Sequence, residues 1–531
     1  MNLQDPSMTL GTMLEEIAAE HPRRKGLIFE GKKFTYRLMN QRVNQIANGL
    51  NKLGVRFGHK VAILLPNCPE FIFTYFAVSK LGGINVPINT FLSSEEVKFI
   101  LNDCEVSTLV TSPELFELVK PIRSDLPKLK SILMVGGKDG VEGAIPLERF
   151  DKEPLELEEK FGVRKEDVVV IHYTSGTTGK PKGAMLSHKN LLAAIDANID
   201  AIRISHRDRV LVFLPLFHAY TFINCTLATF SQGARVILLT SVKPFKRVVN
   251  TILFSRVSVL VGIPPVYHAL VTAKVPRFFH WINPIRVCIS GAAALPAEVL
   301  KQFEKKFKIP LLEGYGLSEA SAGVSVNPLH GKRKPLSVGL PIKGVQIKVI
   351  DEDGNSIETP NKVGELLVKG DTVMVGYYNQ PEETAKTLQE GWLHTGDLVK
   401  IDEEGYIYIV DRKKDMLIVR GMNVYPREVE EVLYTHPKVA ECAVIGVPDK
   451  QRGEVPKAFI TLKEGVTATE KEFRRFCHEK IAMYKNPKYF EFRTSLPKTP
   501  TGKILKKALR EEELQKAQDA LAKEEVGEEE F

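Results

Sequence analysis

The chain has 531 residues, too many for a single hydrophobic core, so two or more domains are expected. Its composition, with 44% hydrophobic and 26% charged residues, is that of an ordinary soluble globular protein. The formal charge of +8 is modest for this length; it suits polyanionic ligands such as nucleotides, and we expect no nucleic-acid partner.

Three features bear on the compartment. Six cysteines are scattered without a CxxC pair or a cluster with histidines, which indicates buried free thiols in a reducing environment. The N-terminus lacks the basic and then apolar pattern of a signal peptide. The most apolar window, residues 210–230, contains Pro215, His218 and Asn224, so a buried strand followed by a helix is expected there and not a membrane span. We therefore expect a cytoplasmic protein.

The first part of the chain alternates between helical and strand-like segments. Apolar residues recur at helical spacing from Thr35 to Gly54, and another helical pattern follows Pro69. Short apolar runs typical of buried parallel strands occupy residues 61–65, 84–88, 108–110 and 132–135. This alternation predicts an α/β fold of doubly wound sheets. Residues 136–166 are charged and irregular and should form a surface segment between two such sheets.

Residues 173–183, with the sequence YTSGTTGKPKG, follow an apolar run and precede a helical pattern. Glycines let backbone N–H groups turn toward an anion, hydroxyls donate further hydrogen bonds and lysines add positive charge, so the segment predicts a phosphate-holding loop. Read alone, such a string also suits a surface loop rich in Gly, Ser and Thr. It does not meet the P-loop pattern of NTPases, which needs glycine at Thr174 and Ser or Thr at Pro181.

The second part of the chain changes its pattern twice. Strand-like runs continue at residues 210–213, 235–239, 257–261 and 287–289. From Ser337 short strands and turns predict a small barrel-like β subdomain. After residues 411–415 strands and helices mix within the length of one small domain, and residues 505–525 predict an amphipathic helix with an acidic tail.

Four further motifs carry candidate chemistry. LEGYGLSE (312–319) places an aromatic ring between glycines, then a hydroxyl and a carboxylate that suits a hard metal ion. GWLHTGD (391–397) ends in a carboxylate that could accept both hydroxyls of a ribose. KTPTGK (498–503) has glycine directly before a lysine, and RGMNVYP (420–426) precedes a helical pattern. Taken singly, these motifs also suit a structural turn, a helix start or a solvated lysine.

Together and in this order, the motifs from Tyr173 to Lys503 resemble those of the adenylate-forming (AMP-binding) family, which includes acyl-CoA synthetases, aryl-CoA ligases, luciferases and the adenylation domains of peptide synthetases. The strings YGLSEASAGVSVNP and VDRKKDMLIVRGMNVYP look most like bacterial medium- and long-chain fatty acyl-CoA synthetases. The resemblance implies ATP, Mg²⁺ and CoA as co-substrates and cofactor. It also implies a large N-terminal domain (1–411), a hinge (412–415) and a mobile α+β C-terminal domain (416–531).

The resemblance also assigns roles to single residues. Lys503 and His218 would be catalytic, Glu319 would bind Mg²⁺, Lys414 would be the hinge, and Gly421 with His218 would line the CoA channel. Within the nucleotide site Tyr315 would stack on adenine, Ser318 would contact the α-phosphate, and Asp397 with Arg412 would hold the ribose. The full set of expected ATP- and AMP-binding residues is Thr174, Ser175, Gly176, Thr177, Thr178, Gly179, Lys180, Gly291, Ala292, Glu313, Gly314, Tyr315, Gly316, Ser318, Asp397 and Arg412.

These assignments predict a fatty acid–CoA ligase that forms acyl-AMP and then acyl-CoA, with the small side chains of residues 290–296 and 320–323 at the acyl pocket. His218 and Tyr220 stand where amino-acid-activating relatives usually carry an aspartate, which disfavours an amino-acid substrate. An aryl-CoA ligase remains the alternative. A phosphoryl-transferring NTPase, a luciferase-type oxidase and a non-enzymatic binding protein are less favoured.

Two expectations concern partners. The basic and aromatic residues of segment 274–281 are of a kind found at membrane surfaces and suggest weak peripheral membrane contact, although a packed loop suits them equally. A homodimer is left open by the sequence.

Overall fold

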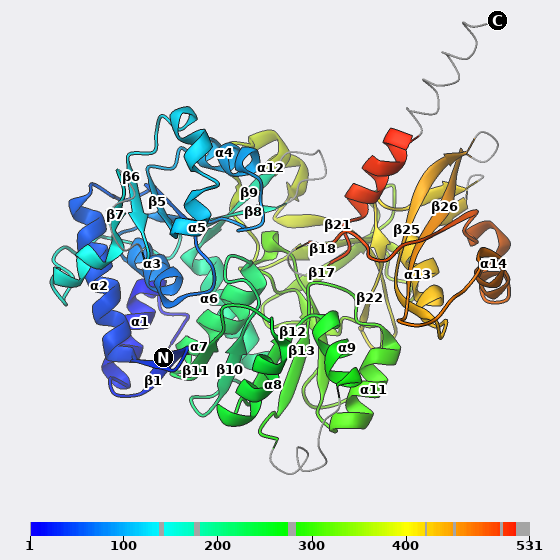
Figure 1. The fold of residues 1–531 in the computed structure, drawn as a ribbon, viewed down its shortest axis with the longest axis horizontal. Helices are drawn as coiled ribbons and strands as arrows, with labels where there is room; N and C mark the ends of the chain where they lie inside the picture. Colours follow the sequence, from blue (N-terminus) through cyan, green and yellow to red (C-terminus); the bar gives the residue numbers. More distant parts are fainter. Residues whose placement is uncertain are drawn as a thin grey trace, which may run out of the picture.

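The computed structural model describes residues 2–136, 143–174, 181–273, 283–419, 422–449, 453–499 and 503–516. Figure 1 shows two sheets with their helices in the first two thirds of the chain, and the C-terminal sheet on the far side of the molecule from the first of them. Among the described residues, no helix has both the length and the apolar character that a membrane crossing requires.

The first sheet has eight strands in the order β19-β9-β8-β4-β3-β5-β6-β7, parallel from β8 to β7 and antiparallel from β8 to β19. Val61, Ile63 and Leu64 of β3 are fully buried, as expected for a strand covered on both faces. The strands are β3 (Lys60–Leu64), β4 (Ile84–Pro87), β5 (Thr108–Thr111), β6 (Ser131–Met134), β7 (Ile145–Pro146), β8 (Val168–Thr174), β9 (Lys182–Ser187) and β19 (Gly376–Tyr377). The helices in this part are α2 (Tyr36–Lys52), α3 (Pro69–Lys80), α4 (Ser94–Asp103) and α5 (Pro113–Phe116), with the 3₁₀ helices η1 (Lys120–Asp125) and η2 (Leu147–Lys152).

The second sheet has nine strands in the order β16-β15-β14-β13-β12-β10-β11-β1-β2, parallel from β14 to β1. The strands are β1 (Lys25–Phe29), β2 (Lys32–Thr35), β10 (Arg209–Val212), β11 (Arg235–Leu238), β12 (Val259–Gly262), β13 (Val287–Ser290), β14 (Leu311–Tyr315), β15 (Ser325–Val326) and β16 (Leu340–Pro341). Its helices include α1 (Leu10–Glu20), α6 (His188–Ile202), the π-helix η3 (Tyr220–Leu227), α7 (Ala228–Ser231), α8 (Phe245–Phe254), α9 (Pro264–Thr272), α11 (Ala297–Phe307) and the 3₁₀ helix η4 (Ser318–Ala320).

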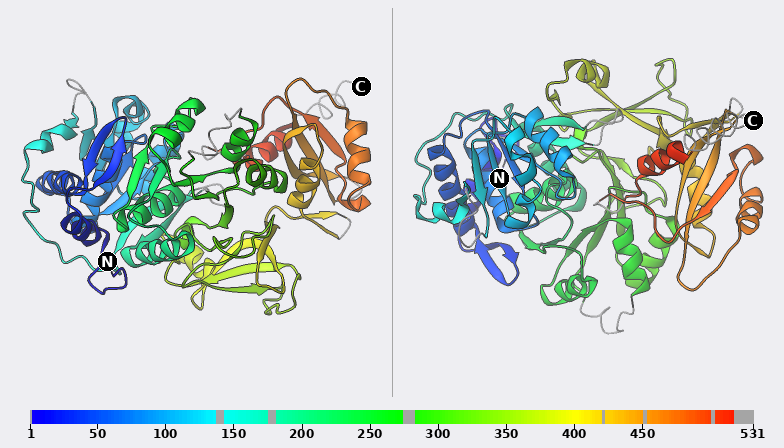
Figure 2. Two further views of the ribbon diagram at one scale, coloured as in Figure 1. Left: turned by 90° about the horizontal axis from the view of Figure 1, so that it is seen from below. Right: turned by 45° about the horizontal axis from the view of Figure 1, so that its top comes forward.

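Two smaller sheets complete the chain, and Figure 2 shows them from two further directions. The β subdomain is an antiparallel five-stranded sheet of β17 (Gln346–Ile350), β18 (Gly364–Lys369), β20 (Leu388–Gln389), β21 (Trp392–Ile401) and β22 (Ile407–Arg412), with α12 (Pro381–Thr387) nearby. The C-terminal part holds β23 (Leu417–Val419), β24 (Met422–Val424), β25 (Val439–Asp449), β26 (Gly453–Leu462) and β27 (Tyr489–Phe492), with α13 (Pro426–Tyr434), α14 (Glu470–His478), the 3₁₀ helix η5 (Met483–Lys485) and a helix over 506–516.

The buried apolar residues of the N-terminal part and of the C-terminal part form separate clusters. One continuous cluster joins Leu27, Val61 and Phe222 to Leu366 and Ile407, so both large sheets and the β subdomain share a core. The C-terminal sheet packs on its own cluster, which includes Leu417, Val429 and Phe473. Strands β22 and β23 therefore belong to different cores, and residues 413–416 connect them.

The α/β fold predicted from the alternating pattern is confirmed, and the predicted helices and strands lie within a few residues of their expected bounds. Residues 210–230 form a buried strand and then a helix, as predicted, but the helix begins with π geometry. The irregular segment after residue 136 contributes the edge strand β7. In the C-terminal helix Leu509 is buried, whereas Leu514 is 55% exposed, so the apolar stripe is shorter than the leucine spacing indicated.

Candidate functional site

Strands β8 and β9 bring together the two ends of the predicted phosphate loop. Thr174 lies opposite Lys182 in the antiparallel register, which closes the base of the loop. The loop itself lies outside the described residues: Ser175, Gly176, Thr177, Thr178, Gly179 and Lys180. The structure therefore describes only the two ends of the loop, at Thr174 and Lys182.

Glu319 lies directly beside the base of this loop. Its Oε1 accepts hydrogen bonds from the Thr174 hydroxyl at 3.4 Å and from the Tyr377 hydroxyl at 3.1 Å. In the part of the chain that the structure describes, no three His, Cys, Asp or Glu residues cluster closely enough to hold a metal ion. A single oriented carboxylate fits Mg²⁺ that completes its coordination with phosphate oxygens and water, because Mg²⁺ is rarely enclosed by protein ligands alone.

Tyr377 contacts the predicted metal ligand Glu319, and no sequence motif indicated it. It lies on β19, which pairs with β9, and this pairing places its hydroxyl on Glu319. Lys182 lies over the Tyr377 ring, with 5.4 Å between Nζ and the ring centroid, and forms a short ion pair with Glu383 of α12. Only the three-dimensional pairing reveals these contacts, because Tyr377 lies 58 residues from Glu319 in the chain.

The predicted nucleoside site is formed by strands from two sheets. Asp397 of β21 and Arg412 of β22 are register partners, and Arg412 Nε lies 2.8 Å from Asp397 Oδ1. Tyr315, from the end of β14, donates a short hydrogen bond to the other oxygen of the same carboxylate. Asp397 is only 2% exposed, and its negative charge raises the pKa of the Arg412 guanidinium. Tyr315, Asp397 and Arg412 thus form one connected group.

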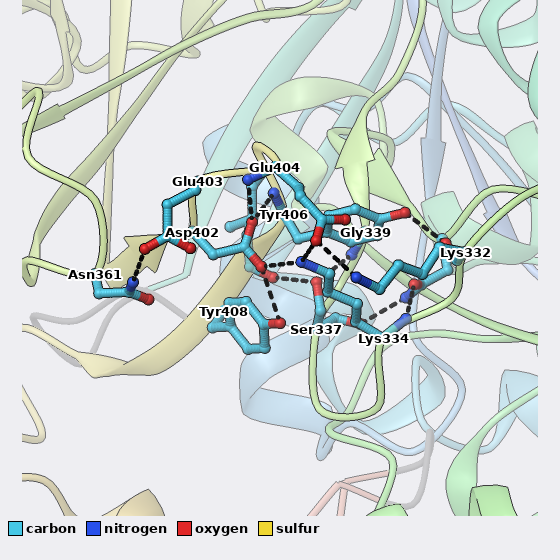
Figure 3. Close-up of polar contacts among 12 residues, drawn as sticks. Lys332, Lys334, Ser337, Gly339, Asn361, Asp402, Glu403, Glu404, Tyr406 and Tyr408 are labelled. Atoms are coloured by element: carbon cyan, nitrogen blue, oxygen red, sulfur yellow. Dashed lines mark hydrogen bonds and ion pairs between the residues drawn. The ribbon is translucent and has the colours of Figure 1, made fainter.

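The turn between β21 and β22 is bound to the segment between β15 and β16, as Figure 3 shows. Lys334 Nζ lies 2.5 Å from Asp402 Oδ2 and 3.1 Å from Glu404 Oε1, and Tyr408 donates to Asp402 at 3.2 Å. The backbone N–H of Lys334 also donates to Asn327, which in turn donates to the carbonyl of Glu313 at the end of β14. This network joins the strand of Tyr315 to the strand pair of Asp397 and Arg412.

Lys503 approaches this group from the C-terminal domain. Its carbonyl accepts the backbone N–H of Thr499 at 2.7 Å, and its own N–H donates to the Thr499 hydroxyl at 3.1 Å, so Lys503 is tied to Thr499 by two hydrogen bonds. The surrounding protein displaces water from the side chain and lowers the pKa of Lys503 to about 8. The positive charge of Arg412 is the second cause of this lowering, while Asp397 opposes it.

His218 lies on the loop between β10 and η3. Burial lowers the pKa of His218 to about 4, and the charge of Lys503 contributes. The loop is fixed from below by Asn67, whose amide donates to the carbonyls of Leu214 and Leu239 at 2.9 and 3.0 Å. The imidazole is therefore neutral at physiological pH.

A cavity extends from His218 into the second sheet. Its described walls include the small residues Gly291, Ala292, Ala322 and Gly323, which come from both segments predicted to surround an acyl group. Ala292 has a φ of 65°, a conformation uncommon for residues with a side chain and often found at functional sites. None of the described lining residues is Asp, Glu, Lys or Arg.

Glu313 directly precedes Gly314 and Tyr315 of the predicted nucleoside site. Burial raises its pKa to about 7, although its Oε1 accepts the backbone N–H of Leu295 at 2.9 Å. Its Oε2, and the hydroxyl of its register partner Ser290, are buried and have no hydrogen-bond partner among the described residues. Both lie at the carboxyl ends of parallel strands, where sheets of this class bind ligands.

The other predicted residues lie at the edges of this region. Gly314, Gly316 and Ser318 line the cavity with Tyr315. A Cβ on Gly316 would lie 2.3 Å from the carbonyl oxygen of Ala322, so only glycine allows this close approach. Lys414 lies exposed between β22 and β23. Gly421 and the basic aromatic segment 274–281 lie outside the described residues.

The chain is similar to known proteins over almost its whole length. Residues 14–378 match the family model described as AMP-binding enzyme, and residues 428–503 match its C-terminal domain. The chain is 37% identical to a long-chain-fatty-acid–CoA ligase of Bacillus subtilis, over 96% of this chain and 95% of that protein. It is 36% identical to a feruloyl-CoA synthase of an Amycolatopsis species, over 94% and 98%.

The fold is likewise similar to solved structures. An anthranilate CoA ligase bound to anthranoyl-AMP superposes with a TM-score of 0.89 at 31% sequence identity, covering 97% of this chain and all of that one.

Proposed function

The chain belongs to the AMP-binding enzyme family of acid–thiol ligases, and from this premise we propose that it converts a medium- or long-chain fatty acid, Mg·ATP and CoA into acyl-CoA, AMP and pyrophosphate. The observation that supports the proposal is the Arg412–Asp397 ion pair, which lies near enough to Lys503 of the C-terminal domain for both of its charges to act on the pKa of that lysine. Lys503 belongs to the C-terminal domain, and Arg412 and Asp397 belong to the β subdomain. The positive charge of Lys503 would stabilise the negative charge that develops when the acid attacks the α-phosphate.

The first half-reaction is the formation of acyl-AMP. Arg412 and Asp397 would hold the nucleoside, and Lys503 would stabilise the charge that develops on the carboxylate and α-phosphate. Mg²⁺, when bound beside Glu319, would neutralise charge on the phosphates of the leaving pyrophosphate. In the second half-reaction the CoA thiolate attacks the acyl carbonyl and AMP leaves.

The nature of the acid is supported by the cavity. Its described lining contains no charged side chain that could pair with the amino group of an amino acid or with a second carboxylate. The small and apolar walls suit an alkyl chain, as does the similarity to a fatty-acid ligase. Aryl acids are the second candidate, because the cavity walls also include the amides of Asn198 and Asn224, which an alkyl chain leaves unused.

We also propose that the protein is cytoplasmic. All six cysteines are buried and free, which is consistent with a reducing, cytoplasmic environment.

The test is an assay of AMP and pyrophosphate release with CoA across acetate, hexanoate, decanoate, palmitate, benzoate and 4-coumarate. We expect AMP release that depends on both acid and CoA, and the highest kcat/KM with decanoate or palmitate. Highest activity with benzoate or coumarate would favour the aryl alternative. Release of ADP and phosphate in place of AMP would contradict the proposed reaction.

A further inference from the structure

The side chain of Asp411 joins the β subdomain to the C-terminal domain. Asp411 lies on β22, directly before Arg412, and is only 5% exposed. Its Oδ1 accepts the backbone N–H of Arg412 at 2.7 Å, and its Oδ2 accepts the backbone N–H of Arg427 at 2.9 Å. Arg427 belongs to α13, which packs in the C-terminal core through Val429 and Leu433. One buried carboxylate therefore holds backbone groups of both domains.

The second of these hydrogen bonds caps the N-terminus of α13. Arg427 is the second residue of this helix, after Pro426, and at that position the backbone N–H has no acceptor within the helix. The side chain of Tyr425, the N-cap residue, donates or accepts no capping hydrogen bond. A carboxylate at a helix N-terminus also interacts favourably with the helix dipole. Asp411 thus supplies the cap of α13 from the other domain.

The same helix is tied to the segment that carries Lys503. Glu430 of α13 lies 2.8 Å from Lys506, three residues after Lys503, and the two side chains are only 14% and 19% exposed. Glu430 also accepts the backbone N–H of Val444 on β25 at 2.7 Å. Burial acts to lower the pKa of Lys506, but the negative charges of Glu430 and Asp411 raise it above its ordinary value. Contacts therefore lead from β22 through α13 to the segment of Lys503.

We propose that Asp411 is a positioning residue for adenylate formation, because it holds the C-terminal domain in the arrangement that brings Lys503 toward the nucleoside site. In this role it acts through α13 and not by contact with the reacting groups. The rotation expected at Lys414 carries α13 away from β22, so the bond between Asp411 and Arg427 serves the first half-reaction and not the second. The inference rests on the proposed acid–CoA ligase activity and adds a residue to its first half-reaction.

The variant Arg427→Pro removes the N–H that Asp411 accepts and leaves Asp411 in place. Proline suits the first turn of a helix, and α9 of this chain begins with two prolines, Pro264 and Pro265. Arg427→Ala is the matched control. It loses the same side chain, including the 3.3 Å contact with Glu431, but keeps the N–H.

Both half-reactions are measured, as acid-dependent pyrophosphate exchange and as the conversion of supplied acyl-AMP and CoA to thioester. The acid is the one that the wild-type protein uses best in the AMP-release assay. In pyrophosphate exchange we expect the kcat/KM of Arg427→Pro to be roughly tenfold or more below that of Arg427→Ala, because hydrogen bonds to charged groups contribute about this much. In thioester formation the two variants should agree within about twofold, because the rotated domain does not use the bond.

A second variant tests the acceptor of the same bond. Asp411→Ala should cause a similar selective loss of pyrophosphate exchange. Adding Arg427→Pro to Asp411→Ala should lower the exchange no further, since both changes break one bond. If the double variant shows the product of the two single losses, the residues act separately and the inference is wrong.

The outcomes distinguish this inference from the proposed function. Equal pyrophosphate exchange by Arg427→Pro and Arg427→Ala would overturn the positioning role of Asp411. Equal losses by Arg427→Pro in both half-reactions would also overturn it, because they indicate a general loss of structure. In both cases the ligase activity stands. Absence of pyrophosphate exchange and AMP release by the wild-type protein with every acid would overturn the proposed function, and the inference with it.

Discussion

At the scale of single residues, the charge of Lys503 decides what the site can do. The pKa of this lysine is lowered to about 8, chiefly by desolvation and then by the charge of Arg412. A lysine below its pKa is charged, so the side chain is cationic at neutral pH and loses its charge as the pH rises through about 8. The catalytic role proposed for Lys503 needs this charge.

This gives a pH prediction. The kcat/KM of acid-dependent pyrophosphate exchange should fall above about pH 8, because the free enzyme loses one proton from Lys503 there. Lys503→Arg is the matched control, because a guanidinium stays protonated over the whole pH range of the assay. The kcat/KM of this variant should not fall above pH 8, whatever its absolute value. The assignment is contradicted if wild type and Lys503→Arg lose activity over the same pH range.

Residue motifs could predict one part of the site and not another. Tyr315, Glu319, Asp397 and Lys503 are recognisable because each lies in a short string with glycine or a hydroxyl at fixed spacing. No comparable string indicates Tyr377, the contact of Lys182 with the Tyr377 ring, or the hydrogen bond between Asn198 and Asn224. Their roles arise from strand pairing and from the packing of α6 on η3, which a linear pattern does not encode.

At the scale of elements, the β21–β22 hairpin would support the proposed nucleoside site. It carries Asp397 and Arg412, and its turn is held by Lys334 through Asp402. The Lys334 and Asp402 side chains are 16% and 10% exposed, whereas those of the neighbouring pair Lys332 and Glu404 are 63% and 49% exposed. The two lysines therefore form contacts of similar length in different environments.

This difference gives an element-scale prediction. Lys334→Met should lower the thermal midpoint of unfolding and raise the KM for ATP, because it leaves Asp402 without its cation and loosens the hairpin. Lys332→Met is the control and should change neither quantity measurably, since exposed ion pairs contribute little. The supporting role is refuted if both variants behave alike in melting and in ATP kinetics.

Most helices and strands could be predicted from the sequence. Two features could not, because they depend on contacts between distant parts of the chain. The hairpin β1–β2 was not predicted, since its strands are short and interrupted by charged residues, and it is stabilised by pairing with the distant strand β11. The π geometry of η3 also has no periodic signature in the sequence. Both features depend on tertiary contacts and not on local preference.

At the scale of the whole molecule, the connection between the domains is bounded by two ion pairs. Lys413 lies 2.9 Å from Glu365 of β18, and Asp415 lies 2.7 Å from Arg510 of the C-terminal helix. The exposed Lys414 lies between these two attached residues. We expect rotation of the C-terminal domain to be concentrated at Lys414, which would withdraw Lys503 and present the opposite face of that domain for thioester formation.

The domain-level prediction from sequence relied on the change of pattern near residue 411. The structure has separate cores on the two sides of residues 413–416. The rotation itself stays a prediction, because the structure holds a single arrangement of the domains.

The central claim is that Lys503 serves adenylate formation only, and one measurement tests it most directly. Wild type and Lys503→Ala are compared in both half-reactions, using acid-dependent pyrophosphate exchange and the conversion of supplied acyl-AMP and CoA to thioester. We predict a loss of roughly 10²–10³-fold or more in the first and nearly normal rates in the second, because the charge is needed where the α-phosphate is attacked. Equal losses in both half-reactions would contradict the claim.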